Sequence, residues 1–184
     1  TMTRPDDVSL AYYSAPGPMT DPGAHAALFD VLPPSLPALV HVVQNILLHM
    51  HSAEAYGVTL TDERREEASI RSVDEMVTCL LTMDDSALTK ARPFEDRVVG
   101  TCRDYAVLLC SMLRHIGAPA RARCGFGAYF LPGHHEDHWA CEVWNPDTRP
   151  TTASTCRPNG TWVGLAESEA AYGRCTAIRS QRSS

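Results

Sequence analysis

Two side chains of this sequence are suited to nucleophilic chemistry and occupy informative positions. Cys102 lies at the start of a predicted helix, where unpaired backbone N–H groups and the positive end of the helix dipole stabilise a thiolate and can receive an oxyanion. His138 begins the half-apolar segment HWACEVWN, which predicts a strand, and it is the best candidate for a nearby base. The expected chemistry is attack of the Cys102 thiol on an amide or ester carbonyl, assisted by His138, to give an acyl-enzyme.

The segment around Cys102 predicts a long helix followed by two strands. Thr101 and Asp104 form a capping signature, which favours a capping role for Asp104 over a catalytic one, and Gly117 is typical of a helix end. We therefore expect a helix from about Cys102 to Ile116, and its nearly encircling apolar content indicates that it is buried. APARARCGFGAYF predicts a first strand, and NPDT predicts the turn after the second strand.

The first half of the chain is predicted to be helical. Ser35 caps a helix whose apolar residues recur at spacings of three and four as far as Met50, and Gly57 closes this segment. Ser72 and Glu75 form a capping box that opens another helix. Helices followed by strands imply an α+β domain with an antiparallel sheet.

Size and charge limit the classes of function. The chain has 184 residues, of which 44% are hydrophobic, and a formal net charge of −6, which fits one globular domain with a buried core. It lacks the clustered basic residues by which proteins bind nucleic acids or anionic membranes, so neither partner is expected. The apolar run from Leu36 to Met50 is too short and too polar to span a bilayer, and residues 1–10 lack the apolar segment of a secretion signal. We therefore expect a cytoplasmic protein, and the sequence gives no indication of its oligomeric state.

The other cysteines and histidines have simpler explanations. Seven cysteines without a CxxC pair predict free thiols rather than a disulfide framework, and Cys110 and Cys141 are expected in the core. HHEDHWAC, which begins at His134 and His135, offers metal ligands, but no HExxH or CxxC accompanies it, so neither a metal nor a cofactor is expected. His49 is predicted on the partly exposed face of the first helix.

Two motifs follow one another in a fixed order along the chain. The pattern G-x-C-x-x-x-A-x-L-x-x-x-L-R-x-x-G-x-P-A-R is made by Gly100, Cys102, Ala106, Leu108, Leu113, Arg114, Gly117, Pro119, Ala120 and Arg121. The pattern H-x-x-x-E-V is made by His138, Glu142 and Val143. Together they resemble the core of the transglutaminase-like superfamily, and the helical first half is similar to bacterial stand-alone members. The resemblance implies a papain-like α+β core, with Cys102 as the nucleophile at a helix start and His138 as the base on a strand.

The third residue of that family's site has no clear counterpart in this sequence. The family places an acid on the strand after the histidine strand, whereas Thr155 stands in that region and Asp147 lies in the preceding turn. Glu142 is four residues beyond His138, roughly 13 Å along a strand at ~3.3 Å per residue, too far for a direct hydrogen bond unless the strand bends. No residue is therefore assigned as the orienting acid.

Residues 151–184 differ in composition from the rest of the chain. Large aliphatic side chains occur there only at Val163, Leu165 and Ile178. Such a segment cannot easily supply further buried strands. We therefore expect a single domain over residues 1–150, with a helical part (1–95) and a catalytic core motif (96–150), and hypothesise that 151–184 is a frame-altered or degenerate end.

The predicted function is a cysteine enzyme that acts on the amide bond of a protein or peptide-like substrate through Cys102 and His138. Hydrolysis is favoured over cross-linking. The alternative is a catalytically impaired binding or scaffold protein of the same family, which the missing acid and the unusual end both favour.

Overall fold

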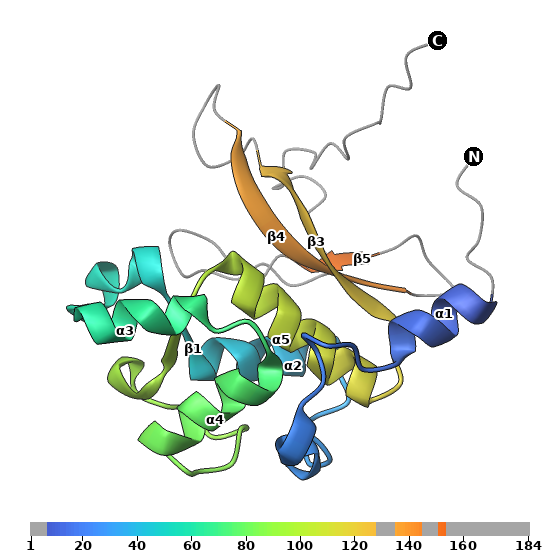
Figure 1. The fold of residues 1–184 in the computed structure, drawn as a ribbon, viewed down its shortest axis with the longest axis horizontal. Helices are drawn as coiled ribbons and strands as arrows, with labels where there is room; N and C mark the ends of the chain where they lie inside the picture. Colours follow the sequence, from blue (N-terminus) through green and yellow to red (C-terminus); the bar gives the residue numbers. More distant parts are fainter. Residues whose placement is uncertain (1–6, 128–134, 145–150, 154–184) are drawn as a thin grey trace.

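A computed structural model describes residues 7–127, 135–144 and 151–153 of the chain, and the helices precede the main sheet in sequence (Figure 1). The helices and strands are α1 (Asp7–Ser14), α2 (Leu36–Ile46), β1 (Leu47–His49), α3 (Asp62–Glu66), α4 (Val73–Met83), β2 (Val98–Gly100), α5 (Cys102–His115), β3 (Ala120–Gly127), β4 (Glu136–Val143) and β5 (Thr151–Ala153). Short 3-10 turns lie at Gly23–Leu28, Met50–Ser52, Glu54–Tyr56, Glu67–Ser69 and Phe94–Asp96. This mixed α+β arrangement agrees with the predicted fold class.

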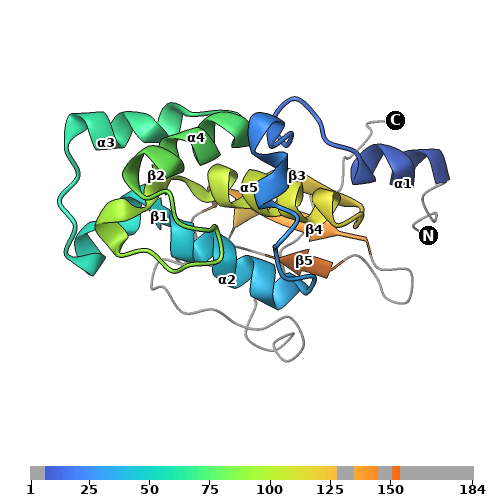
Figure 2. The same ribbon diagram turned by 90° about the horizontal axis from the view of Figure 1, so that it is seen from below.

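Helix α5 is the centre of the fold. Every residue from Asp104 to Leu113 is buried, as the apolar content of this segment predicted. Figure 2 shows α5 between α2 and α4, with the β3–β4 pair beside it, and all of these elements contact α5. The helix ends as predicted, because Gly117 adopts a left-handed conformation (φ 81°) that glycine accepts without strain.

The main sheet is antiparallel, in the order β3-β4-β5. In the β3–β4 register Ala122 lies opposite Cys141, and Gly125 lies opposite His138. Strand β4 begins two residues earlier than expected, so His138 lies inside it rather than at its first position. Strand β5 contains the first residues of the segment that we hypothesised to be frame-altered, and residues 154–184 lie outside the described part of the chain.

The prediction of one continuous helical segment from Ser35 to Gly57 was wrong. Helix α2 ends at Ile46, and the next three residues form β1, which pairs in parallel with β2. Leu48 of β1 and Val99 of β2 are both fully buried by this pairing. The partner strand is distant in sequence, so the local periodicity of the first half could not reveal it. As a consequence His49 lies at a strand end, opposite Gly100, and not on a helix surface.

A buried arginine organises the chain between α4 and β2. The Arg92 side chain has no exposed surface, and its Nε lies 3.7 Å from Oδ2 of Asp84. Its terminal nitrogens donate to the backbone carbonyls of Asp84, Ser86, Ala87 and Lys90. The guanidinium thus supplies hydrogen-bond donors to loop carbonyls that have no partner in a regular helix or strand.

We predict that Arg92→Met lowers the free energy of unfolding by about 3 kcal/mol, because it leaves several backbone carbonyls without their donor and removes the cation beside Asp84. Urea unfolding followed by circular dichroism measures the change. The matched control is Arg65→Met on the exposed surface of α3, which we expect to change stability by less than about 0.5 kcal/mol. Equal losses in the two variants would contradict a structural role for the buried guanidinium.

Candidate functional site

The start of α5 is held by a buried carboxylate. Cys102 is the first residue of the helix, and Thr101 precedes it as the cap. The Thr101 backbone N–H donates to Oδ2 of Asp104 at 2.7 Å, and the Thr101 hydroxyl donates to the same oxygen at 3.1 Å. Asp104 is only 3% exposed. The predicted capping role of Asp104 is therefore confirmed.

The Asp104 side chain lies so close to Gly100 that it leaves no room for a side chain at that position. A Cβ added to Gly100 would lie 2.9 Å from Cβ of Asp104 and 3.0 Å from its Oδ2, closer than side chains approach one another. The glycine two residues before Cys102 thus lets β2 run directly into the capped helix. This contact gives a physical reason for the G-x-C spacing in the sequence.

Arg103 fixes the helix start to the preceding helical part. Its Nε donates to Oδ1 of Asp104 at 2.9 Å, and its Nη2 donates to the backbone carbonyls of Ala68 and Ile70 at 3.1 and 2.9 Å. The guanidinium therefore joins the loop before α4 to the first turn of α5. Both carboxylate oxygens of Asp104 are engaged, one by Thr101 and one by Arg103.

The Cys102 thiol contacts the strand that carries His138. The backbone N–H groups of Trp139 and Arg103 lie close enough to its sulfur to lower the pKa of the thiol. Burial nevertheless raises the pKa of the Cys102 thiol above its usual value of 9.0, and the charges of Asp137 and Asp104 raise it further. The expectation of a stabilised thiolate at this helix start is therefore not met, because desolvation outweighs the backbone donors.

His138 is buried, with 8% of its surface exposed. Burial lowers the pKa of its imidazole below 6.5, and the neighbouring carboxylate of Asp137 opposes this shift. At neutral pH the ring is therefore uncharged and can accept a proton. The sulfur of Cys102 lies close to the backbone of Trp139, the residue that follows His138.

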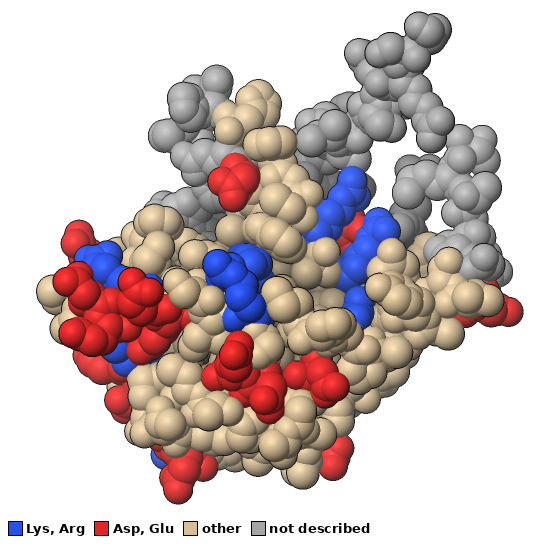
Figure 3. All heavy atoms as spheres, in the orientation of Figure 1, with Lys and Arg blue, Asp and Glu red and all other residues tan. Residues whose placement is uncertain are grey.

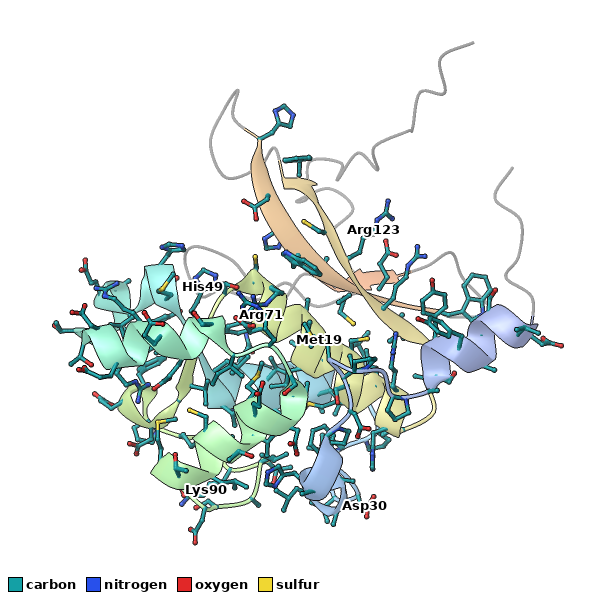
Figure 4. All side chains as sticks on the ribbon, in the orientation of Figure 1. Met19, Asp30, His49, Arg71, Lys90 and Arg123 are labelled. Carbon is teal, nitrogen blue, oxygen red and sulfur yellow. The ribbon has the colours of Figure 1, made fainter. Side chains whose placement is uncertain are left out.

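Two acids near His138 differ in their availability. Glu142 accepts hydrogen bonds from Arg121 at 2.7 Å and Arg123 at 2.9 Å, so its carboxylate is already engaged by two guanidinium groups. Figure 3 shows basic side chains in blue beside an acidic side chain in red over β3 and β4, the strands that carry these residues, and Figure 4 labels Arg123 there. Asp137, which the sequence suggested only as part of a metal-binding motif, is the acid whose charge acts on both Cys102 and His138. Asp147 lies outside the described residues.

His49 lies near the candidate site, and the sequence reasoning missed it. Figure 4 shows it on the side of the helical part below β3 and β4, opposite the side that carries Asp30 and Lys90. Burial lowers its pKa to about 4, with smaller contributions from the charges of His51 and His138. Its position could be found only by recognising that residues 47–49 pair with β2.

Two of the remaining cysteines are buried, and the HHEDHWAC motif lies partly outside the described residues. Cys110 and Cys141 are fully buried, as predicted, and the five cysteines in the described part of the chain are free thiols. Among the described residues no three His, Cys, Asp or Glu side chains are grouped so that they could hold a metal ion. His134 of the HHEDHWAC motif lies outside these residues. No helix in the described ranges is long and apolar enough to cross a bilayer.

The family model of the transglutaminase-like superfamily matches residues 54–165, which is more than half of the chain. The chain belongs to the transglutaminase-like superfamily. The match includes both Cys102 and His138, and it extends past β5. A search of curated proteins and a search of solved structures found no match. The α5 helix packed on the β3–β4 pair is consistent with a transglutaminase-like core.

We predict that Gly100→Ala displaces Asp104 and destabilises the start of α5, since the added methyl group meets a carboxylate that is engaged on both oxygens. The expected loss is about 1–3 kcal/mol in the free energy of unfolding, the usual cost of overpacking, measured by urea denaturation. In Gly125→Ala the added Cβ has nothing within 4 Å, so this control should retain stability. Wild-type stability in Gly100→Ala would show that the close contact is not restrictive.

Proposed function

We propose that the protein is a cysteine-dependent enzyme that cleaves amide bonds, with Cys102 as the nucleophile and His138 as the general base. The observation that carries this proposal is the position of the Cys102 thiol, close enough to the backbone N–H of Trp139 for that group to lower the pKa of the thiol. Trp139 follows the buried His138 on β4, and α5 packs against this strand. Membership in the transglutaminase-like superfamily supports the same assignment.

The proposed reaction passes through an acyl-enzyme. The Cys102 sulfur forms a bond to the carbonyl carbon while the thiol proton moves to His138, and the backbone N–H of Cys102 receives the oxyanion. When the tetrahedral intermediate collapses, the C–N bond breaks and the amine leaves with the proton from His138. Water, deprotonated by His138, then releases a carboxylic acid and restores the thiol. A protein or peptide-like amide is the proposed substrate, and hydrolysis is favoured over transfer to a second amine.

The resting pair is expected to be uncharged. The pKa of Cys102 is raised by burial and that of His138 is lowered by burial, so near neutral pH the site holds a thiol and a neutral imidazole. Proton transfer then accompanies attack, in place of a preformed thiolate–imidazolium pair.

A second candidate function is a catalytically weak binding or scaffold protein. The observation that favours it is the engagement of Glu142 by Arg121 and Arg123, which removes the acid on the face of β4 that also carries His138. In the serine-protease template, loss of the orienting acid costs up to ~10⁴ in rate. Such a protein would retain the fold and the cysteine but react slowly.

We predict that iodoacetamide labels Cys102 of the wild-type protein at neutral pH faster than it labels Cys79, and that His138→Ala removes this advantage. Without the neighbouring base, a thiol with a raised pKa contributes little thiolate. Peptide mass spectrometry gives the rate at each cysteine, and Cys79, half-buried on α4, is the internal reference in both proteins. Uniform slow labelling that ignores His138→Ala would instead support the scaffold function.

We also predict the pH dependence of acylation of Cys102 by p-nitrophenyl acetate. The base must be unprotonated, and because burial lowers the pKa of His138, the acid limb should have its midpoint below the ordinary value of 6.5. Asp137→Asn removes a carboxylate that raises this pKa, so the limb should move to still lower pH. The control Asp62→Asn, on exposed α3, should leave it in place, and a midpoint above 6.5 in the wild-type protein would contradict the assignment.

A further inference from the structure

The imidazole of His49 lies over the first turn of α5. In the parallel β1–β2 pair, His49 is the register partner of Gly100, which lies two residues before Cys102. The His49 ring centroid is 6.1 Å from that of Tyr105, three residues beyond Cys102 on the helix. Contacts on both sides of Cys102 therefore place this ring at the nucleophile's end of α5.

The backbone of His49 is rigidly held. Leu48, the residue before it, is fully buried, and the Tyr105 hydroxyl donates to the carbonyl of Leu47 at 2.9 Å. Strand β1 is thus tied to α5 as well as to β2. A side chain at the end of such a strand keeps its position relative to the start of the helix, which a catalytic group requires.

The hydrogen bonding of His49 indicates which ring nitrogen carries the proton. Nδ1 is buried and has no hydrogen-bond partner among the described residues, whereas the residue as a whole is only half-buried. An N–H at Nδ1 would be a buried donor without an acceptor, which is unfavourable. The proton is therefore assigned to Nε2, and the ring offers an N–H donor from its other edge.

The ring also stays neutral while its neighbour is charged. Burial, with smaller contributions from the charges of His51 and His138, lowers the pKa of His49 to about 4. When His138 takes the thiol proton, His49 therefore remains an uncharged imidazole. Neutral imidazoles whose pKa is lowered by their surroundings can polarise a substrate carbonyl in enzymes.

We propose that His49 is a further catalytic residue, whose Nε2–H donates a hydrogen bond to the substrate carbonyl oxygen as that oxygen gains negative charge. This inference rests on the proposed function of Cys102 and His138. The backbone N–H groups of Arg103 and Trp139 lie close enough to the sulfur to lower the pKa of the thiol, so we assign the oxyanion to other donors. The Cys102 backbone N–H and His49 supply them from the two sides of the helix start.

Two reagents separate this role from a general effect on the thiol. p-Nitrophenyl acetate acylates Cys102 through an oxyanion, with p-nitrophenolate as the leaving group. Iodoacetamide alkylates the same sulfur by displacement of iodide, and no oxyanion forms. An oxyanion donor should therefore matter only for the first reagent.

For His49→Ala we expect the rate of acylation of Cys102 to fall by a factor of about 10², the usual effect of removing one oxyanion donor. The rate of alkylation should change by less than about threefold. His49→Gln keeps an N–H donor and should recover at least about tenfold of the lost acylation. His41→Ala, on the exposed face of α2, should change neither rate. Thermal unfolding by circular dichroism checks that each variant is folded. If His49→Ala does not fold, the ratio of the acylation rate to the alkylation rate is compared in His49→Asn and His49→Gln instead.

Three results would overturn the inference. Equal losses of acylation and alkylation would show that His49 only positions the thiol or His138. Unchanged acylation would show that it has no role in the reaction. If the wild-type protein is never acylated at Cys102, and if His138→Ala does not change the rate of alkylation, the proposed function itself is wrong. If alkylation depends on His138 but the acylation rate does not depend on His49, only this inference is wrong.

Discussion

The carboxylate of Asp104 is the group on which the geometry of the site depends. It is nearly inaccessible to solvent, and it ties together the Thr101 backbone, the Arg103 guanidinium and, through its close approach, Gly100. These residues flank Cys102 on both sides. A buried carboxylate is tolerated only when it is fully hydrogen-bonded, so its partners cannot move independently. The position of the sulfur is therefore set by a charge that takes no part in the proposed chemistry.

The same constraint extends to the elements around α5. Arg103 carries the link to the backbone of Ala68 and Ile70, before α4, and the hydroxyl of Tyr105 carries a second link to β1. On the opposite side, the backbone N–H of Trp139 on β4 lies close enough to the sulfur to lower the pKa of the thiol. The helical part and the sheet therefore meet at the first turn of α5. In the proposed reaction, side chains from β1, α5 and β4 can act on one amide group only because this turn is anchored from each direction.

The parts of the structure that the sequence predicted are those encoded by local signals. The capping signatures at Ser72 and Thr101 specify the starts of α4 and α5, and apolar periodicity identifies the buried helix. The sequence could not show that residues 47–49 leave the helical pattern to pair with β2, because the free energy of that pairing comes from a segment far along the chain. His49 was therefore misplaced, while Cys102 and His138, each next to a strong local signal, were correctly placed at a helix start and on a strand. The raised pKa of Cys102 was missed for a related reason: a helix start is visible in sequence, whereas the burial that opposes it is not.

Burial changes which group must orient the proposed base. In a solvated site an imidazole turns freely, and an acid is needed to hold its ring and to stabilise its charge. His138 is enclosed on β4, its pKa is lowered by that enclosure, and the acid that shares its strand face is bound to two arginines. Packing can then restrict the ring, but it cannot stabilise the imidazolium that forms during attack. In the described residues that stabilisation comes from the adjacent Asp137, whose charge raises the pKa of His138. The Asp137 carboxylate is exposed, so water screens its charge. This arrangement therefore favours attack by a neutral thiol and imidazole over attack by a preformed thiolate–imidazolium pair.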